Sequence, residues 1–320
     1  MTLAAFTPAQ RDCAHQLLAA KVARMMGRKL EEGDWSEVYC RAKDIPNRGW
    51  SNLNIDVIHL GLGVEHKMLC YRSNIDITQA CGETLMHPAA TRAIRIPPGR
   101  ISAERAMREI LQQYGARIRE RTEKVRAEAP KGTKPDMRTG WLLWQESLRQ
   151  FLYFEERMEA PNPEDYTARW VSSGGGARLA SRNLWIYDRA TNRKRFSVTT
   201  AAGAKIQPYF DVPLPDDPNL YLFTVIGEVI LRGRIRCWVT RTTLEDLRKA
   251  LGKVDSETIG RAVQEHLGKL PRAKAGPPVQ DPAEPIEISA ETYELLTSRL
   301  PGVNDDHCFQ LLIRALKKRD

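Results

Sequence analysis

The stretch Ser51–Lys67, SNLNIDVIHLGLGVEHK, decides the fold that this chain is expected to adopt. Asn52–Leu60 is rich in Leu, Ile and Val, and Val64–Tyr71 continues the pattern, so both runs are predicted to be strands. Gly61-Leu62-Gly63 between them offers two glycines for positive φ, which indicates a tight turn. The segment is therefore predicted to form a β-hairpin.

Charged side chains are expected to converge on this hairpin. Residues two apart on a strand share a face, so Glu65 and Lys67 point the same way and His66 points the other. Pairing of the two strands then brings Asp56 beside them. Two carboxylates suit Mg²⁺, a hard ion that takes oxygen ligands. Such a metal lowers the pKa of a bound water and stabilises charge on phosphate oxygens, so the set favours phosphodiester hydrolysis.

Each residue of the hairpin site has an expected role. Asp56 and Glu65 are predicted metal ligands, and the backbone carbonyl of His66 is a further candidate ligand. Lys67 is expected to orient the attacking water or to stabilise the developing charge. A short helix is predicted near Asp34–Ala42, and it offers Glu37 as an additional carboxylate.

The acidic part of the hairpin also matches a known motif. Glu65-His66-Lys67 is the only acid-x-Lys triplet in the chain, and Asp56 lies nine residues upstream. With these residues, the region from Gly33 to Tyr71 resembles the PD-(D/E)xK nuclease superfamily, to which many type II restriction endonucleases belong. The family's proline is replaced here by Ile55.

The resemblance implies an α/β fold of the restriction-endonuclease type, with a mixed central sheet flanked by helices. It further implies Mg²⁺ dependence and DNA cleavage, with Asp56 and Glu65 as metal ligands and Lys67 as the catalytic lysine. The alternative interpretation is an ordinary hairpin in which Glu65 and Lys67 form a surface ion pair and Asp56 is a capping residue.

The charge of the chain points to a polyanionic partner. Its 320 residues include 49 Lys and Arg against 40 Asp and Glu, a net charge of +9. Thr91–Pro135 holds twelve basic and five acidic residues, and Gly176–Asp211 holds seven and two. Basic side chains at this density can neutralise the phosphates of double-stranded DNA.

Two groups of basic residues are the candidate DNA contacts. On a helix predicted over Ser102–Ala129, the alternative is a solvated face with pairs such as Glu120–Lys124. In the turn Asp188–Arg195 between two strands, two arginines are candidate base readers. The candidates are Arg117, Arg121 and Lys124 on the helix, and Arg189, Arg193, Lys194 and Arg195 in the turn, with Arg193 and Arg195 as the readers.

The expected organisation has three parts. Residues 1–270 form the nuclease core, with a helical insertion at about 100–170, including a helix at Trp141–Glu159, and a DNA-contacting segment at about 176–211. Two strands at Leu220–Val225 and Arg234–Val239, followed by a helix, have the form of a pair that closes such a core sheet. Residues 271–285 are Pro-rich and are predicted to be a linker.

The last part, residues 286–320, is predicted to be a small strand-helix-helix tail. It resembles a ribbon-helix-helix unit, with Ile286 and Ile288 in the strand. Glu287 stands where a DNA contact would be expected to carry a neutral or basic side chain, so a dimerisation or packing role is preferred.

Location follows from what the sequence does not contain. The first residues show no signal peptide, and the longest apolar stretch, Leu220–Leu231, is interrupted by Glu228 and is too short to span a bilayer. The six cysteines form no CxxC pair, which favours a reduced cytoplasmic protein without a membrane partner.

The function expected from the sequence is therefore that of a Mg²⁺-dependent type II restriction endonuclease-like enzyme acting on double-stranded DNA. A homodimer is expected, because two active sites cut two strands. The alternatives are a non-catalytic, sequence-specific DNA-binding regulator that uses the basic loops and the ribbon-like tail, and an RNA-processing nuclease with the same active site.

Overall fold

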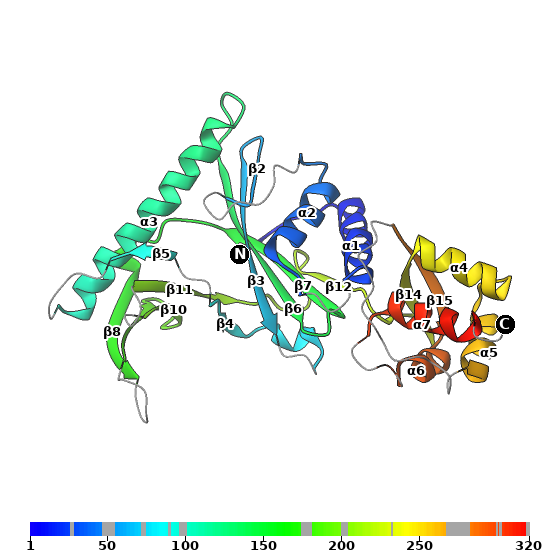
Figure 1. Ribbon diagram of the computed structural model, residues 1–320. Helices are drawn as coiled ribbons and strands as arrows, with labels where there is room; N and C mark the ends of the chain where they lie inside the picture. The colour runs from blue at the N-terminus through cyan, green and yellow to red at the C-terminus, as the bar shows by residue number, and fades with distance from the viewer. Residues whose placement is uncertain are drawn as a thin grey trace.

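A six-stranded mixed sheet lies at the centre of the molecule (Figure 1). The computed structural model of the chain describes residues 1–25, 29–46, 55–71, 75–88, 91–95, 101–173, 181–199, 204–231, 233–266, 282–298, 300 and 303–317. In sheet order the strands are β1 (Thr2–Leu3), β7 (Gln150–Arg157), β6 (Asp136–Gln145), β3 (Leu62–Tyr71) and β2 (Val57–His59), and β12 (Tyr221–Thr224) also pairs with β7.

The central sheet mixes parallel and antiparallel pairs. β3 and β6 run parallel along the whole length of both strands, from Leu62 opposite Asp136 to Tyr71 opposite Gln145. The other neighbours are antiparallel. The chain is therefore an α/β protein whose mixed central sheet is flanked by helices, as the sequence predicted.

The hairpin predicted at the start of the sheet is present. β2 pairs antiparallel with β3, with Val57 opposite Val64. The turn consists of Leu60 and Gly61, whose φ angles are 47° and 90°. Two positive φ values in a two-residue turn match the twist of the strands. The turn thus precedes the predicted position by one residue, so that Gly63 belongs to β3. Residues 52–54 of the expected first strand lie outside the described residues.

Helices α1 (Pro8–Ala23) and α2 (Glu32–Ala42) cover one face of the central sheet (Figure 1). A capping box starts α1, because the Thr7 hydroxyl accepts from the Gln10 N–H and the Gln10 side chain accepts from the Thr7 N–H. Pro8 fits the first helical position, where its missing N–H costs nothing. The shared core includes Leu18, Val22, Trp35, Tyr39, Val64, Tyr153 and Phe223.

The helix expected at Trp141–Glu159 is wrong. This region forms most of the antiparallel β6–β7 hairpin, with Trp141 opposite Phe154 and Leu143 opposite Leu152. Both faces of this hairpin are covered at its centre, so Trp141–Trp144 and Phe151–Phe154 are apolar at every position. A continuous apolar run of this kind has no period of two, and a buried helix gives the same pattern.

A second sheet forms a separate layer of the molecule, at the left of Figure 1. Its order is β4 (Thr84–Met86), β11 (Ala204–Asp211), β10 (Lys194–Thr199), β9 (Ser181–Asp188) and β8 (Tyr166–Ser173), and β5 (Thr91–Ile94) also pairs with β11. The helix α3 (Ala103–Ala127) packs Met107, Ile110 and Leu111 against it. The insertion at about 100–170 is therefore helical only in α3, and its remainder consists of strands with the short 3₁₀ turn η2 (Pro163–Asp165).

The C-terminal part of α3 lies directly on β3. A Cβ added to Gly63 would be 2.6 Å from Val125 Cγ2 and 2.8 Å from Met137 Sδ. Val125 is fully buried and packs with Ile55 and Met137. Glycine at position 63 therefore permits the close approach of α3 to the strand that carries Glu65 and Lys67.

The C-terminal part of the chain forms one unit. β13 (Glu228–Leu231), β14 (Arg234–Thr240) and β15 (Ala283–Ser289) make an antiparallel sheet, with α4 (Arg241–Leu251), α5 (Ser256–His266), α6 (Ala290–Ser298) and α7 (Asp305–Lys317) packed on it. The order strand, helix, helix is confirmed for the tail. A separate tail is wrong, because Ile286 pairs with Cys237 and Ile288 with Ile235.

The same pairing corrects two neighbouring expectations. Of the two strands expected to close the core sheet, β12 joins that sheet, whereas β14 belongs to the C-terminal unit. Most of the expected linker, 271–281, lies outside the described residues, and residues 283–285 belong to β15. In the part of the chain that the structure describes, no helix is long and apolar enough to cross a membrane.

Gly63→Ala should destabilise the fold by about 1–3 kcal/mol, because the new methyl group would overlap with Val125 and Met137. The double variant Gly63→Ala/Val125→Ala should be more stable than the sum of the two single effects predicts, since removing the valine methyl groups makes room. Urea unfolding of the four proteins of this cycle measures the coupling. Strictly additive effects would show that α3 does not contact β3 at this point.

Candidate active site

The predicted residues meet where β2 ends beside β3. The β2–β3 pairing stops at Val57 opposite Val64, so Asp56 lies just beyond it, at the level of Glu65 and His66. The Asp56 carboxylate accepts a hydrogen bond of 2.6 Å from the backbone N–H of His66. Asp56 therefore replaces the strand partner that β2 no longer provides, and this contact fixes its carboxylate at the edge of β3.

Glu65 and Lys67 share a face of β3, as predicted. Lys67 Nζ donates to Glu65 Oε1 at 2.7 Å. The other oxygen, Oε2, lies 3.0 Å from a guanidinium nitrogen of Arg121 on α3, as an ion contact without hydrogen-bond alignment. The Glu65 side chain is only 10% exposed. A nearly buried carboxylate is thus held between two cations, one from its own strand and one from the helix above it.

His66 points to the opposite face of β3. Its Nδ1 is 2.9 Å from Ser36 Oγ on α2, and its ring is fully buried among Trp35, Tyr39 and Tyr153. Burial, with a smaller contribution from Lys67, lowers the pKa of His66 to about 3, so the ring is neutral. The imidazole belongs to the core, and only the backbone of His66 faces the site, as the sequence analysis proposed.

The environment of Asp56 disfavours its charge. Burial, followed by repulsion from Glu65, raises the pKa of Asp56 to about 7, although Lys67 and the His66 N–H act in the opposite direction. Glu32 adds a further repulsion. Burial is thus the main cause and the neighbouring carboxylates add to it, so an added cation would stabilise the ionised form of Asp56.

The extra carboxylate that α2 contributes is Glu32, not the expected Glu37. Glu37 binds Lys21 of α1 at 2.6 Å and turns away from the hairpin. Burial raises the pKa of Glu32, while Lys67 lowers it and Glu65 raises it, so Glu32 lies within electrostatic reach of both. Helical spacing could have indicated Glu32. Residues four apart share a side of a helix, so Glu32 lies on the same side of α2 as Ser36, which contacts His66 of β3.

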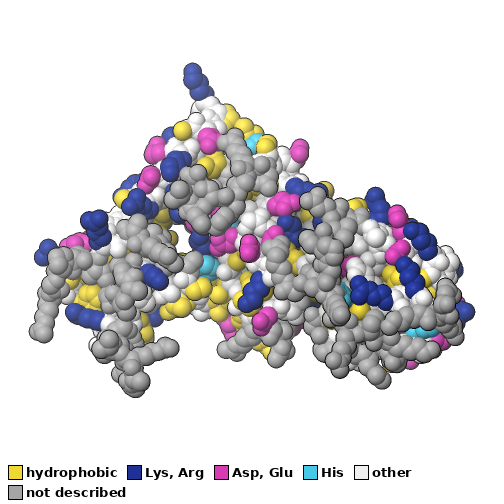
Figure 2. Space-filling model, in the orientation of Figure 1, with side chains coloured by type: hydrophobic (Ala, Val, Ile, Leu, Met, Phe, Trp, Pro, Cys, Tyr) yellow, Lys and Arg dark blue, Asp and Glu magenta, His cyan; other side chains and the backbone are white. Residues whose placement is uncertain are grey.

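The basic residues expected to bind DNA on α3 divide into two groups. Arg121 contacts Glu65 and is part of the site. Arg117 and Lys124 lie on the exposed surface, where both form ion pairs with Glu120, as in the alternative interpretation. Figure 2 shows Lys and Arg side chains alternating with acidic ones along the outer side of this helix.

The basic residues of the β9–β10 turn have partners within the chain. Arg189 donates to the backbone oxygens of Glu164 and Tyr166. Arg193 and Arg195 both contact the carboxylate of Asp211, at 3.3 and 2.7 Å. Lys194 lies over the ring of Trp185. The two arginines expected to read bases are thus engaged by one carboxylate, and their role in DNA recognition remains a prediction.

The side chains of this site that could hold a metal ion are the carboxylates of Asp56 and Glu65. Across the described residues, no three or more Asp, Glu, His or Cys side chains are arranged so that they could hold a metal ion. Mg²⁺, however, is commonly bound by one or two carboxylates, with water and substrate phosphates completing the coordination. Two carboxylates at the end of a hairpin fit that kind of site.

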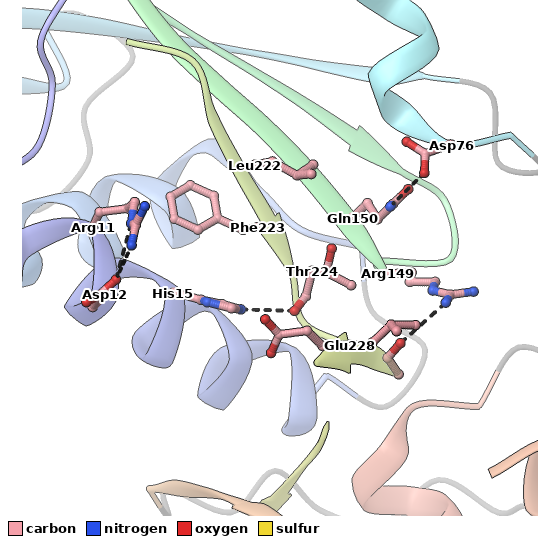
Figure 3. A pocket seen from close by; sticks show the side chains of 12 residues that line it. Arg11, Asp12, His15, Asp76, Arg149, Gln150, Leu222, Phe223, Thr224 and Glu228 are labelled. Carbon is pink, nitrogen blue, oxygen red and sulfur yellow. Dashed lines mark hydrogen bonds and ion pairs between the residues drawn. The ribbon is translucent and has the colours of Figure 1, made fainter. Parts of the chain in front are cut away.

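A polar pocket of about 480 Å³ lies away from this cluster, beside α1, β12 and β13 (Figure 3). Its lining includes Arg11, Asp12, His15, Arg149 and Glu228. His15 Nε2 is 2.9 Å from the carbonyl oxygen of Thr224, Arg149 donates to the carbonyl oxygen of Gly227, and Arg11 pairs with Asp12. No local sequence pattern predicts this pocket, because its residues come from distant segments of the chain.

No family model, no curated protein and no solved structure matches this chain. The chemistry of the site therefore has to follow from its own side chains.

The free energy of unfolding should fall as the pH rises from about 4 to about 7, because of the titration of the Asp56 carboxyl. Its pKa is about 7 in the folded chain and 3.8 ordinarily, so in this window the folded state keeps a proton that the unfolded state loses. Asp56→Asn should remove this fall, which we expect to be roughly 2–4 kcal/mol.

Urea unfolding of both proteins in EDTA at several pH values measures the difference in their free energies of unfolding as a function of pH. Other titrating groups contribute equally to both proteins, including His66, whose lowered pKa has the opposite effect on stability. Parallel curves for the wild type and Asp56→Asn would show that the pKa of Asp56 is ordinary.

Proposed function

We propose that this chain is a Mg²⁺-dependent nuclease that hydrolyses phosphodiester bonds of double-stranded DNA, with a core of the restriction-endonuclease type. One observation carries the proposal. Asp56 and Glu65 come together at the edge of β3 with Lys67 bound to Glu65, and burial together with Glu65 raises the pKa of Asp56 to about 7. A surface ion pair and a capping Asp56 explain the two contacts singly, but they do not explain why a partly buried Asp56 lies against a second carboxylate.

The donors at the site fit a hard cation. One oxygen of Asp56 accepts from the His66 N–H, which leaves its other oxygen available, and a bound cation would take the place of Lys67 at Glu65. In an extended strand the N–H and C=O of one residue point to the same side, so the His66 carbonyl faces the edge where Asp56 lies. All three donors are oxygens, as Mg²⁺ requires. Mg²⁺ bound there supplies an acidified water and positive charge for the phosphate oxygens.

Lys67 and Arg121 have different roles in this proposal. Lys67 is partly exposed, and in this proposal its ammonium group turns from Glu65 to a phosphate oxygen or to the attacking water. There it would stabilise the negative charge that develops as the phosphorus–oxygen bond breaks. Arg121 contacts Glu65 from α3 and positions that carboxylate.

The positive charge of the chain supports DNA as the substrate. The chain carries a net charge of +9, and Arg117 and Lys124 are exposed on the helix that also provides Arg121. Surface ion pairs such as theirs with Glu120 contribute little, so DNA phosphates can compete for these cations. Cleavage of both strands of a duplex would need two such sites, for which a homodimer is the simplest arrangement.

Plasmid cleavage with Mg²⁺ tests the proposed function. Lys67→Ala should lower the single-turnover rate by about 10²-fold or more, because it removes the cation that meets the developing charge. Glu32→Gln should lower the rate, whereas Glu37→Gln should leave it unchanged. The two glutamates lie on the same helix, but the charge of Lys67 acts on Glu32, whereas Glu37 is paired with Lys21.

Three outcomes would contradict the proposal. Equal rates for the wild type and Lys67→Ala would exclude the lysine from the chemistry. Duplex binding without cleavage, unaffected by Glu65→Ala, would favour a DNA-binding regulator. Cleavage of RNA in preference to duplex DNA would keep the active site but change the substrate.

Mg²⁺ should stabilise the folded chain, because binding to the folded state alone raises the free energy of unfolding. The effect should grow as the pH rises through about 7, where Asp56 ionises. Asp56→Asn and Glu65→Gln should each reduce the shift in the thermal midpoint, and Asp255→Asn, which alters a partly exposed acid paired with Lys253, should not. An equal shift in all four proteins would place the ion elsewhere.

A further inference from the structure

Among the described residues, α3 packs on one face of the second sheet and no helix packs on the other. Leu184, Ile186 and Val198 point toward α3 and form a core with it. Because side chains alternate along a strand, Trp185 and Tyr187 of β9 point to the other face. Arg169 of β8 lies directly opposite Trp185 in the pairing of β8 with β9. This outer face therefore combines aromatic and basic side chains from neighbouring strands.

Cations and rings alternate across four strands of this face. The Arg169 guanidinium is 4.8 Å from the ring centre of Tyr187 and 5.6 Å from that of Trp185, and it also donates to the Tyr187 hydroxyl. Lys194 Nζ is 3.5 Å from the ring centre of Trp185 and 4.8 Å from that of Tyr209. We call Arg169, Trp185, Tyr187, Lys194 and Tyr209 the cation–aromatic face.

The two cations of this face have no acid to balance them. Within the described part of the chain, no ion pair joins Arg169 or Lys194 to a carboxylate, whereas Arg193 and Arg195 share that of Asp211. Burial and the charge of Arg169 lower the pKa of Lys194, so the two cations also repel one another. Contact with rings only partly offsets this, by about 0.5–1 kcal/mol at exposed sites. The face is therefore complementary to an anion.

The rings decide which anion fits best. Carboxylates of an acidic peptide would match the cations but would leave three aromatic rings unused. The bases of a duplex are already stacked on one another, so they expose only their edges. Bases of a single strand have free faces, and aromatic rings on a sheet surface bind them without regard to sequence.

We propose that the cation–aromatic face binds single-stranded nucleic acid. Phosphates would draw Arg169 and Lys194 off the rings, and the bases would stack on Trp185, Tyr187 and Tyr209. The proposal does not depend on hydrolysis at Asp56 and Glu65, since those residues lie on the central sheet, and binding at the cation–aromatic face needs no metal.

Fluorescence anisotropy with a labelled single-stranded oligodeoxynucleotide in EDTA tests the proposal. Trp185→Ala should weaken binding by about tenfold or more, and Trp185→Phe should restore most of the affinity because it keeps a ring. Arg169→Ala and Lys194→Ala should each make the dependence of log K on log[salt] shallower by about 0.7. Arg261→Ala on α5, which removes an exposed arginine paired with Glu257, serves as the control and should change neither quantity.

The proposal is wrong if folded Trp185→Ala binds the strand as tightly as the wild type does. If circular dichroism shows that Trp185→Ala does not fold, Tyr209→Ala and Arg169→Ala provide the same test of binding. Tighter binding of duplex DNA or of a poly-glutamate peptide at this face would also overturn it. Lys67→Ala should abolish cleavage without changing strand binding, so a failure of one proposal is distinguishable from a failure of the other.

Discussion

The parallel pairing of β3 with β6 is the constraint on which the rest of the structure depends. It fixes β3 in the middle of the central sheet, so that one face of the strand lies against α2 and the other lies under α3. Alternation along β3 then puts His66 in the core and holds Glu65 and Lys67 under α3. A slip by one residue would exchange these positions and bury the two charges among aromatic rings.

The charged groups of the site are held in place by specific contacts, although the ionised form of Asp56 is unfavourable there. Glu65 is held by Lys67 and Arg121, while Asp56 is fixed by the His66 N–H and forms no ion pair with any of the described residues. The rise in the pKa of Asp56, caused mainly by burial, is a cost to stability at neutral pH. Such a cost is common where a group serves chemistry rather than folding.

The features that local sequence determines could be predicted. Runs rich in Leu, Ile and Val on both sides of Gly61 predicted the β2–β3 hairpin, and the spacing of Asp56, Glu65 and Lys67 predicted the cluster. Features set by tertiary packing could not. The β6–β7 hairpin is apolar on both faces, and β15 finds its partner β14 more than forty residues upstream. The choice of Glu32 over Glu37 depends on how α2 rotates when Trp35 packs into the core.

The most direct test of the site is a crystal structure with Mn²⁺ and a short DNA duplex, in which anomalous scattering locates the ion. We predict one ion in contact with both Asp56 and Glu65, with a DNA phosphate oxygen beside it and Lys67 turned from Glu65 toward that phosphate. An ion bound elsewhere, or a duplex that lies away from Asp56 and Glu65, would contradict the assignment of this cluster as a nuclease active site.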